Sequence, residues 1–217
     1  MTELAEGTVD VWEVSLDIDD AATAELATVL SNDESERANR FVEERARQQY
    51  VISRAAIREI LGTYLARAPR EITFTMTGAG KPVLAAPNEL QLEFNMSHSG
   101  ELAVIGVARS RHIGIDVEQV RPLPKALQLA ERFFSESEYT SLRGLPENEL
   151  VREFLSIWVT REGTAKAQGL SVWRGLAKLG TPSGWTAAPI DLGSEYVGAV
   201  VAAGDDWRVV RRGLFRF

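Results

Sequence analysis

A long helical segment followed by short strands occurs twice along this sequence, and that order limits the folds open to it. Apolar residues recur at helical spacing from about residue 45 to 66, and a second long helix is expected from about 147 to 168. Short β-branched segments separated by Gly, Pro and Asn follow the first helix, and further strands follow the second. We therefore predict an α+β protein of two halves packed together, with a seam near residues 109–113.

Other segments complete this outline. The side-chain oxygens of residues 31–33 can cap a new helix after the helical segment 21–30, and Ser135 with Glu138 matches a capping box. The strands are expected at 8–16, 71–75, 90–96, 103–108 and 113–118, and over roughly 186–212.

Composition excludes several classes of function. The chain has 217 residues, no cysteine and a net charge of −7. Without thiolates, a metal site must use oxygen ligands or histidine, which favours a hard cation such as Mg²⁺. The acidic balance argues against a nucleic-acid binder. No apolar stretch is long enough to cross a bilayer and no secretory signal is evident, so we expect a cytoplasmic protein without a membrane partner.

The strand expected at residues 113–118 has an acidic face. Its isoleucines and valine share one side, so Asp116 and Glu118 share the other, about 7 Å apart. Two such charges repel by roughly 2 kcal/mol at an effective dielectric near 20, and a divalent cation reverses that penalty. A half-buried edge strand with a solvated polar face is the alternative interpretation.

A carboxylate and an amine recur on the second long helix. Trp158, Glu162 and Lys166 are spaced at i, i+4 and i+8, which places them on one stripe. Glu162 and Lys166 alone would be an ordinary helix ion pair. Beside an acidic strand, however, Glu162 would extend an anionic cluster that Mg²⁺ can occupy, and Lys166 would face a phosphate.

His98 lies between Ser97 and Ser99 at the end of a strand, where it could donate to a phosphate oxygen. A packed or surface histidine is the alternative, and His112 is assigned to that class. The surroundings of Ser97 lack the G-x-S-x-G pattern and the strand–turn–helix setting of a hydrolase nucleophile.

The basic residues before His98 allow two interpretations. Residues 78–82 form a turn rather than a phosphate loop, because Pro82 stands where a P-loop needs Ser or Thr, although Lys81 could still reach a phosphate. The arginines of the N-terminal helices are either a solvated face or the receptor of a second, distant phosphate: Arg37, Arg47, Arg54 and Arg58.

Three motifs occur in order along the middle of the chain: N-x-S-H-S-G at 95–100, I-G-I-D-V-E at 113–118 and W-x-x-R-E-x-x-x-K at 158–166. Together they resemble the 4′-phosphopantetheinyl transferases of the surfactin-synthetase (Sfp-like) group. The resemblance covers about residues 31–170 and includes Arg37, the segment 53–58, Gly80-Lys81-Pro82 and the segment 132–135.

The resemblance implies a pseudo-twofold monomer of two similar α+β halves. Each half would be a small antiparallel sheet packed against a long helix, with the active site in the cleft between them. Residues 1–111 would form the half on the coenzyme A side, and residues 112–217 the half with the metal-binding strand and helix.

The resemblance also implies individual roles. The catalytic residues would be Glu162, Lys166 and His98, and Mg²⁺ would be held by Asp116, Glu118 and Glu162. Coenzyme A, as co-substrate, would be bound by Arg37, Arg47, Gly80, Lys81, Pro82, Asn95, Ser97, His98, Asp116, Arg161 and Lys166.

The implied reaction is attack by a serine hydroxyl of an apo acyl or peptidyl carrier protein on the β-phosphate of coenzyme A, which releases adenosine 3′,5′-bisphosphate. Either Glu162 or a metal-bound water would accept the serine proton. The segment Val120–Pro124 would receive the carrier protein. Local positive charge for an acidic carrier would come from Arg121, Lys125 and the pair at 211–212.

The sequence departs from the family pattern at two positions. Arg161 stands where lysine is usual, and Gly163 where a small Ala or Ser is usual, which costs the helix about 1 kcal/mol. Both departures leave the predicted ligands in place. Two other functions remain as alternatives: a silent protein that binds coenzyme A or a carrier protein, and a Mg²⁺-dependent phosphohydrolase.

Overall fold

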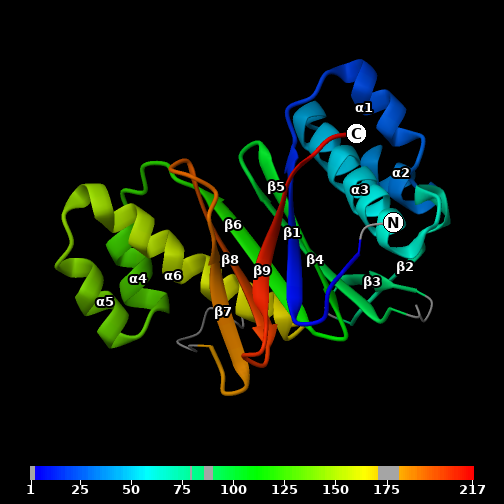
Figure 1. Cartoon of the computed structure of the whole chain (residues 1–217). Helices are drawn as coiled ribbons and strands as arrows, with labels where there is room; N and C mark the ends of the chain where they lie inside the picture. The colour runs from blue at the N-terminus through cyan, green and yellow to red at the C-terminus, as the bar shows by residue number, and fades with distance from the viewer. Residues whose placement is uncertain (1–2, 79, 86–89, 171–180) are drawn as a thin grey trace.

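The computed structural model describes residues 3–78, 80–85, 90–170 and 181–217, and contains two sheets that pack face to face between two helical layers (Figure 1). The first sheet has the order β4 (Leu92–Ser99), β5 (Leu102–Arg109), β1 (Thr8–Ser15) and β9 (Arg208–Phe215). The second has the order β6 (Ile113–Gln119), β8 (Tyr196–Ala203) and β7 (Trp185–Ile190), and β2 (Phe74–Met76) pairs with β3 (Pro82–Leu84) as a separate hairpin. The helices are α1 (Asp20–Ala27), α2 (Asn32–Ala38), α3 (Glu44–Leu65), the short 3-10 helix η1 (Pro69–Glu71), α4 (Ala126–Phe133), α5 (Glu136–Arg143) and α6 (Glu147–Ala167).

Alternation along β5 explains why the first sheet is covered on both sides. Ala103, Ile105 and Val107 pack with the apolar stripe of α3, while Val104 and Ala108 face the second sheet. The inner faces of the two sheets bury Ile113, Ile115 and Val117 of β6. The apolar side chains of β6 thus pack in the core between the two sheets, and the other face of the strand contacts α6.

Helix α6 crosses the outer face of β6 and β8, with α4 and α5 packed beside it. The close approach depends on Gly114, because an added Cβ there would lie 2.0 Å from the carbonyl oxygen of Gly163 and 2.4 Å from the nitrogen of Ala167. The nearest atom to an added Cβ at Gly163 is a methyl group of Val201, at 3.1 Å, and the backbone atoms around it lie at an ordinary 3.8 Å. Gly114 therefore sets the distance between the acidic face of β6 and α6.

Most of the expected elements are confirmed, and the α+β class with two halves is confirmed as well. The capping boxes at Ser31 and Ser135 are present. The strand expected at 71–75 is wrong: residues 69–71 form a 3-10 helix, which Pro69 begins, and the strand starts at Phe74.

The C-terminal strand β9 pairs with β1 in parallel, so the first sheet is mixed rather than purely antiparallel. A strand from the range 112–217 thus completes the sheet of the preceding half. The division at residue 111 remains a prediction. Among the described residues, no helix combines the length and the apolar character that a membrane crossing requires.

Candidate active site

The regular spacing of polar residues on β4 has a structural cause, because β4 and β6 lie side by side where the two sheets meet. Every second residue of β4 faces β6. The backbone N–H of Ile115 donates to Asn95 Oδ1 at 2.9 Å, and Ser97 Oγ donates to Asp116 Oδ1 at 2.7 Å. Side chains therefore join the two strands at this seam.

The same seam continues at Ser99, whose hydroxyl donates to Glu118 Oε2 at 2.7 Å. That hydroxyl also accepts from the backbone N–H of Gln119 at 3.1 Å. Ser99 stands in the first motif without an individual role in our sequence prediction. The structure shows that it orients Glu118.

Asp116 is the centre of the polar cluster and is 2% exposed. Lys166 Nζ donates to Asp116 Oδ1 at 2.6 Å, to Ser97 Oγ at 2.9 Å and to the carbonyl oxygen of Ile115 at 3.2 Å. The other carboxylate oxygen, Oδ2, is buried and forms no hydrogen bond with any residue that the structure describes. Because an unsatisfied buried carboxylate oxygen is costly, this atom is suited to a ligand.

Glu162 lies one helical turn before Lys166 on α6 and is half-buried. Burial, together with the negative charges of Asp116 and Glu118, raises its pKa to about 7, although Lys166 opposes the shift. Burial also raises the pKa of Glu118, against the hydrogen bond from Ser99. The three carboxylates therefore sense one another electrostatically, as ligands of one cation would. In the described part of the chain, no three such side chains are gathered tightly enough to form a metal site as they stand.

A cavity of about 470 Å³ opens on the opposite side of β4 from Asp116. Met96 and His98 of β4 lie at one wall, since alternate residues of β4 face away from β6. The remaining lining comes from α2, α3, the segment between them and the β2–β3 hairpin: Asp33, Glu34, Arg37, Phe41, Ala46, Gln49, Tyr50, Ser53, Arg54, Met76, Gly80 and Pro82.

This cavity gathers four of the residues predicted to bind coenzyme A: Arg37, Gly80, Pro82 and His98. The guanidinium of Arg37 lies 5.5 Å from the ring centre of Tyr50. Partial burial and the charge of Lys166 lower the pKa of His98, and Asp116 acts in the opposite direction. His98 thus connects the cavity electrostatically to the carboxylate cluster.

Lys81 and Arg47 lie elsewhere in the structure. Lys81 Nζ donates to the carbonyl oxygen of Ile113 at 3.0 Å, and its side chain lines a different cavity with Thr77. Arg47 pairs with Glu44 at 2.8 Å on the outer side of α3. Neither residue lines the cavity that contains His98, and their contact with coenzyme A remains a prediction.

Arg161 is placed as a structural residue. It is 3% exposed, its Nη2 lies 2.5 Å from Glu138 Oε2, and its guanidinium covers the ring of Phe134 at 5.2 Å. Its contact with a phosphate remains a prediction. The pair joins the capping box of α5 to α6, one residue from Glu162.

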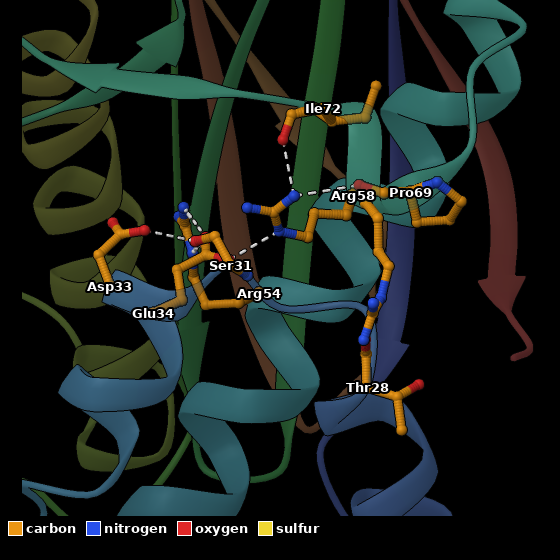
Figure 2. Close-up of polar contacts among 9 residues, drawn as sticks. Thr28, Ser31, Asp33, Glu34, Arg54, Arg58, Pro69 and Ile72 are labelled. Atoms are coloured by element: carbon orange, nitrogen blue, oxygen red, sulfur yellow. Dashed lines mark hydrogen bonds and ion pairs between the residues drawn. The ribbon is translucent and has the colours of Figure 1, made fainter.

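The interpretation of the N-terminal arginines as a solvated face is wrong for two of them. Arg58 is 2% exposed and Arg54 is 12% exposed, and both pair with Glu34 of α2 (Figure 2). Sequence reasoning also missed Tyr50 and Gln49 as cavity residues. Their only signal is the spacing of Ala46, Gln49, Tyr50, Ser53 and Arg54, which places them on one stripe of α3.

Comparison with known proteins agrees with this arrangement. A family model described as "4′-phosphopantetheinyl transferase, N-terminal" matches residues 19–110, and one described as "4′-phosphopantetheinyl transferase superfamily" matches residues 112–195. The second match contains β6 and α6, which carry the carboxylate cluster.

Three relatives illustrate the similarity. The chain is 35% identical to the 4′-phosphopantetheinyl transferase HetI of Nostoc over 212 residues, which span 92% of this chain and 90% of HetI. It is 31% identical to a phosphopantetheinyl transferase of Thraustochytrium, over 73% of this chain and 59% of the relative. It is 29% identical to Sfp of Bacillus subtilis, over 64% of this chain and 60% of Sfp. The matches to the family and the near full-length similarity to HetI show that the chain belongs to the 4′-phosphopantetheinyl transferase superfamily.

Proposed function

We propose that this protein transfers the phosphopantetheine arm of coenzyme A to a serine of an acyl or peptidyl carrier protein and releases adenosine 3′,5′-bisphosphate. The observation that carries the proposal is the contact of Asp116, Lys166 and Ser97 at the seam of β4, β6 and α6. Met96 and His98, on the other face of the same strand β4, line a cavity of about 470 Å³, which we propose holds the nucleotide. Family membership supports the reaction class.

Mg²⁺ fits the donors of this site. All of them are carboxylate oxygens, and Asp116 Oδ2 is buried without a hydrogen-bond partner among the described residues. Burial and the negative charges of Asp116 and Glu118 raise the pKa of Glu162, and a cation would relieve the repulsion between these carboxylates. We propose that Asp116, Glu118 and Glu162 hold it. When bound, Mg²⁺ stabilises negative charge on phosphoryl oxygens.

The remaining chemistry belongs to side chains. Lys166 presents an ammonium next to Asp116, where it stabilises charge on the diphosphate during transfer. The serine oxygen forms a bond to the β-phosphorus while the bond from that phosphorus to the bridging oxygen breaks. Glu162 accepts the serine proton, directly or through a water, and adenosine 3′,5′-bisphosphate leaves. Because a bound cation lowers the pKa of a carboxylate ligand, proton transfer through a water that Glu162 orients fits a Glu162 that also holds Mg²⁺.

The nucleotide of coenzyme A is proposed to occupy the 470 Å³ cavity, with His98 at the diphosphate end and Arg37 at the far end. Gly80 and Pro82 supply the wall from the hairpin. The aromatic ring of Tyr50 gives the nucleotide an apolar surface.

The carrier protein is proposed to dock beside Glu118. A small apolar pocket of about 130 Å³ lies there, between the segment after β6 and α6. It is lined by Glu118, Gln119, Arg121, Leu123, Leu129, Phe154, Leu155 and Trp158. Arg121 supplies positive charge at this pocket, whereas Arg211 and Arg212 pair with Glu13 and Asp10. We therefore propose Arg121 and Lys125, rather than the C-terminal arginines, as contacts for an acidic carrier.

The test is chromatography of the nucleotide products formed from coenzyme A with Mg²⁺, with and without an apo carrier protein. A transferase releases adenosine 3′,5′-bisphosphate only when the carrier is present. Release without a carrier would show a phosphohydrolase, and binding of coenzyme A without any release would show a silent binding protein. A monomeric state and a cytoplasmic location remain predictions.

A further inference from the structure

The open edge of β6 is closed by side chains rather than by another strand. Strand β6 is the last strand of its sheet, and its other neighbour, β4, belongs to the first sheet. The backbone N–H groups of Ile115 and Gln119 donate to Asn95 Oδ1 and Ser99 Oγ of β4, at 2.9 Å and 3.1 Å. The backbone groups at the edge of a sheet need such partners. Two side chains of β4 therefore replace the carbonyl groups of a neighbouring strand.

The residue before Asp116 is held on two sides. Asn95 of β4 accepts from the N–H of Ile115, and Lys166 of α6 donates to the carbonyl oxygen of Ile115 at 3.2 Å. The side chain of Ile115 is fully buried in the core between the two sheets. The backbone that carries Asp116 is therefore fixed by the first sheet and by the helix at the same time.

Asn95 differs from the residues that contact the Asp116 carboxylate directly. Ser97 and Lys166 both donate to Asp116 Oδ1, and both are expected to bind coenzyme A. They must then share this partner with the substrate or exchange it. Asn95 is uncharged and 7% exposed, and its Oδ1 accepts from a backbone group. Asn95 can therefore keep the strand in place while the other two side chains change partners.

The side of β4 on which Asn95 lies agrees with such a role. Asn95 faces β6, whereas Met96 and His98 face the cavity on the other side of the strand. The resemblance to the transferases implied that Asn95 binds coenzyme A, and that contact remains a prediction. The burial of Asn95 and its bond to Ile115 favour a role at the seam.

We infer that Asn95 is a positioning residue whose amide holds β6 in register with β4 and so fixes where Asp116 presents its carboxylate to a divalent cation. The inference rests on the proposed function, which assigns Asp116, Glu118 and Glu162 to Mg²⁺. Groups that orient the ligands of a metal influence its affinity, and their loss lowers that affinity by about 10- to 100-fold. The effect of Asn95 is therefore expected on metal binding and not on the nucleotide.

The first test is a titration of the protein with Mn²⁺, a paramagnetic substitute for Mg²⁺, without coenzyme A. The electron paramagnetic resonance signal of free Mn²⁺ gives the affinity. Asn95→Ala should bind Mn²⁺ about tenfold more weakly than the parent, or weaker still. The matched control is Asn148→Ala, which removes an exposed asparagine near the start of α6 and should bind Mn²⁺ as the parent does.

Calorimetry with adenosine 3′,5′-bisphosphate in EDTA separates this role from a contact with the substrate. Asn95→Ala and the parent should have the same affinity for the nucleotide. A weakened nucleotide with an unchanged affinity for Mn²⁺ would identify Asn95 as a contact of coenzyme A and would overturn the inference.

The second readout is hydrogen exchange at the N–H of Ile115, measured by NMR in EDTA. Asn95→Ala should speed this exchange about tenfold or more, because the N–H loses its acceptor. Asn95→Asp keeps an oxygen at the same place, whether or not its carboxyl group is protonated, and should preserve slow exchange. If Asn95→Ala does not fold, Asn95→Leu replaces it, since leucine has a similar volume and also lacks an acceptor.

A second control separates positioning from a general loss of stability. Ile60→Val changes a buried residue of α3 in the other core and should leave both the Mn²⁺ affinity and the exchange at Ile115 unchanged. The affinity of the parent for Mn²⁺ in Asn95→Ala, or slow exchange at Ile115 in that variant, would overturn the inference. If the parent binds Mn²⁺ and transfers phosphopantetheine, such a result refutes only the role of Asn95. A parent protein that neither binds Mn²⁺ nor transfers the arm refutes the proposed function as well.

Discussion

Gly114→Ala is the substitution with the sharpest structural consequence. The new Cβ would lie 2.0 Å from the carbonyl oxygen of Gly163, more than 1 Å inside the 3.4 Å at which ordinary contact begins. It would also lie 2.4 Å from the nitrogen of Ala167. Both obstacles are backbone, so α6 must move away from β6 as a unit.

The expected magnitudes follow from that displacement. Overpacking of this kind costs about 1–3 kcal/mol of folding free energy. Glu162 and Lys166 lie on the displaced part of α6, and a misplacement of about 1 Å can lower a rate on the order of a hundredfold. We therefore expect the turnover number of Gly114→Ala to fall strongly even at temperatures where the variant is still folded.

The assay combines thermal unfolding with initial rates of carrier modification. Gly163→Ala is the matched control, because the nearest atom to its new Cβ is a side-chain methyl of Val201 at 3.1 Å and alanine gains about 1 kcal/mol of helix propensity. It should stay close to the parent in both measurements. A Gly114→Ala protein with the stability and turnover of the parent would refute the argument that Gly114 sets the position of α6.

Three further predictions concern charge. The pKa of Glu162 is raised, so without metal the folded state loses stability as the pH rises from about 4.5 to about 7. In EDTA, the free energy of unfolding of Glu162→Gln relative to that of the parent should therefore be higher at pH 8 than at pH 5, by on the order of 1–3 kcal/mol. The same difference between variant and parent at both pH values would contradict this. Arg161→Gln should lower the melting temperature and reduce the free energy of unfolding by about 2–4 kcal/mol, without changing the affinity for coenzyme A measured by calorimetry. A selective loss of that affinity would instead support a contact between Arg161 and a phosphate. Lys166→Met should destabilise by about 3–5 kcal/mol because it leaves Asp116 buried without its partner. In the double variant with Asp116→Asn, chemical unfolding should show most of that stability regained, while activity stays absent.

The long elements were predictable because their periodicity extends over several turns or pleats. Helix α3 and strand β5 each bury one regular stripe, and the prediction of both is confirmed. The pairing of β9 with β1 was not predictable, because it joins residues at least 200 positions apart in the sequence, such as Thr8 and Arg208. Strand β9 carries several exposed charged residues and gives no sequence signal of its neighbour.

The site shows the same division. The cluster of Asp116, Lys166 and Ser97 follows from the ordered motifs. The position of Arg161 does not, because the motif gives no information about its partner Glu138, which lies on another helix. The burial of Arg58 was missed for the same reason: its partner, Glu34, lies on α2. A helical stripe identifies which residues share a face, but not whether that face meets water.

The most direct test of the account is the intact mass of an apo carrier protein after incubation with coenzyme A, Mg²⁺ and either the parent or Asp116→Asn. The parent is expected to add one phosphopantetheine, about 340 Da, to the carrier as a covalent product. Asp116→Asn should add none, while the control Asp191→Asn, which changes an exposed carboxylate, should match the parent. Full modification by Asp116→Asn would contradict the placement of the reaction at this carboxylate cluster.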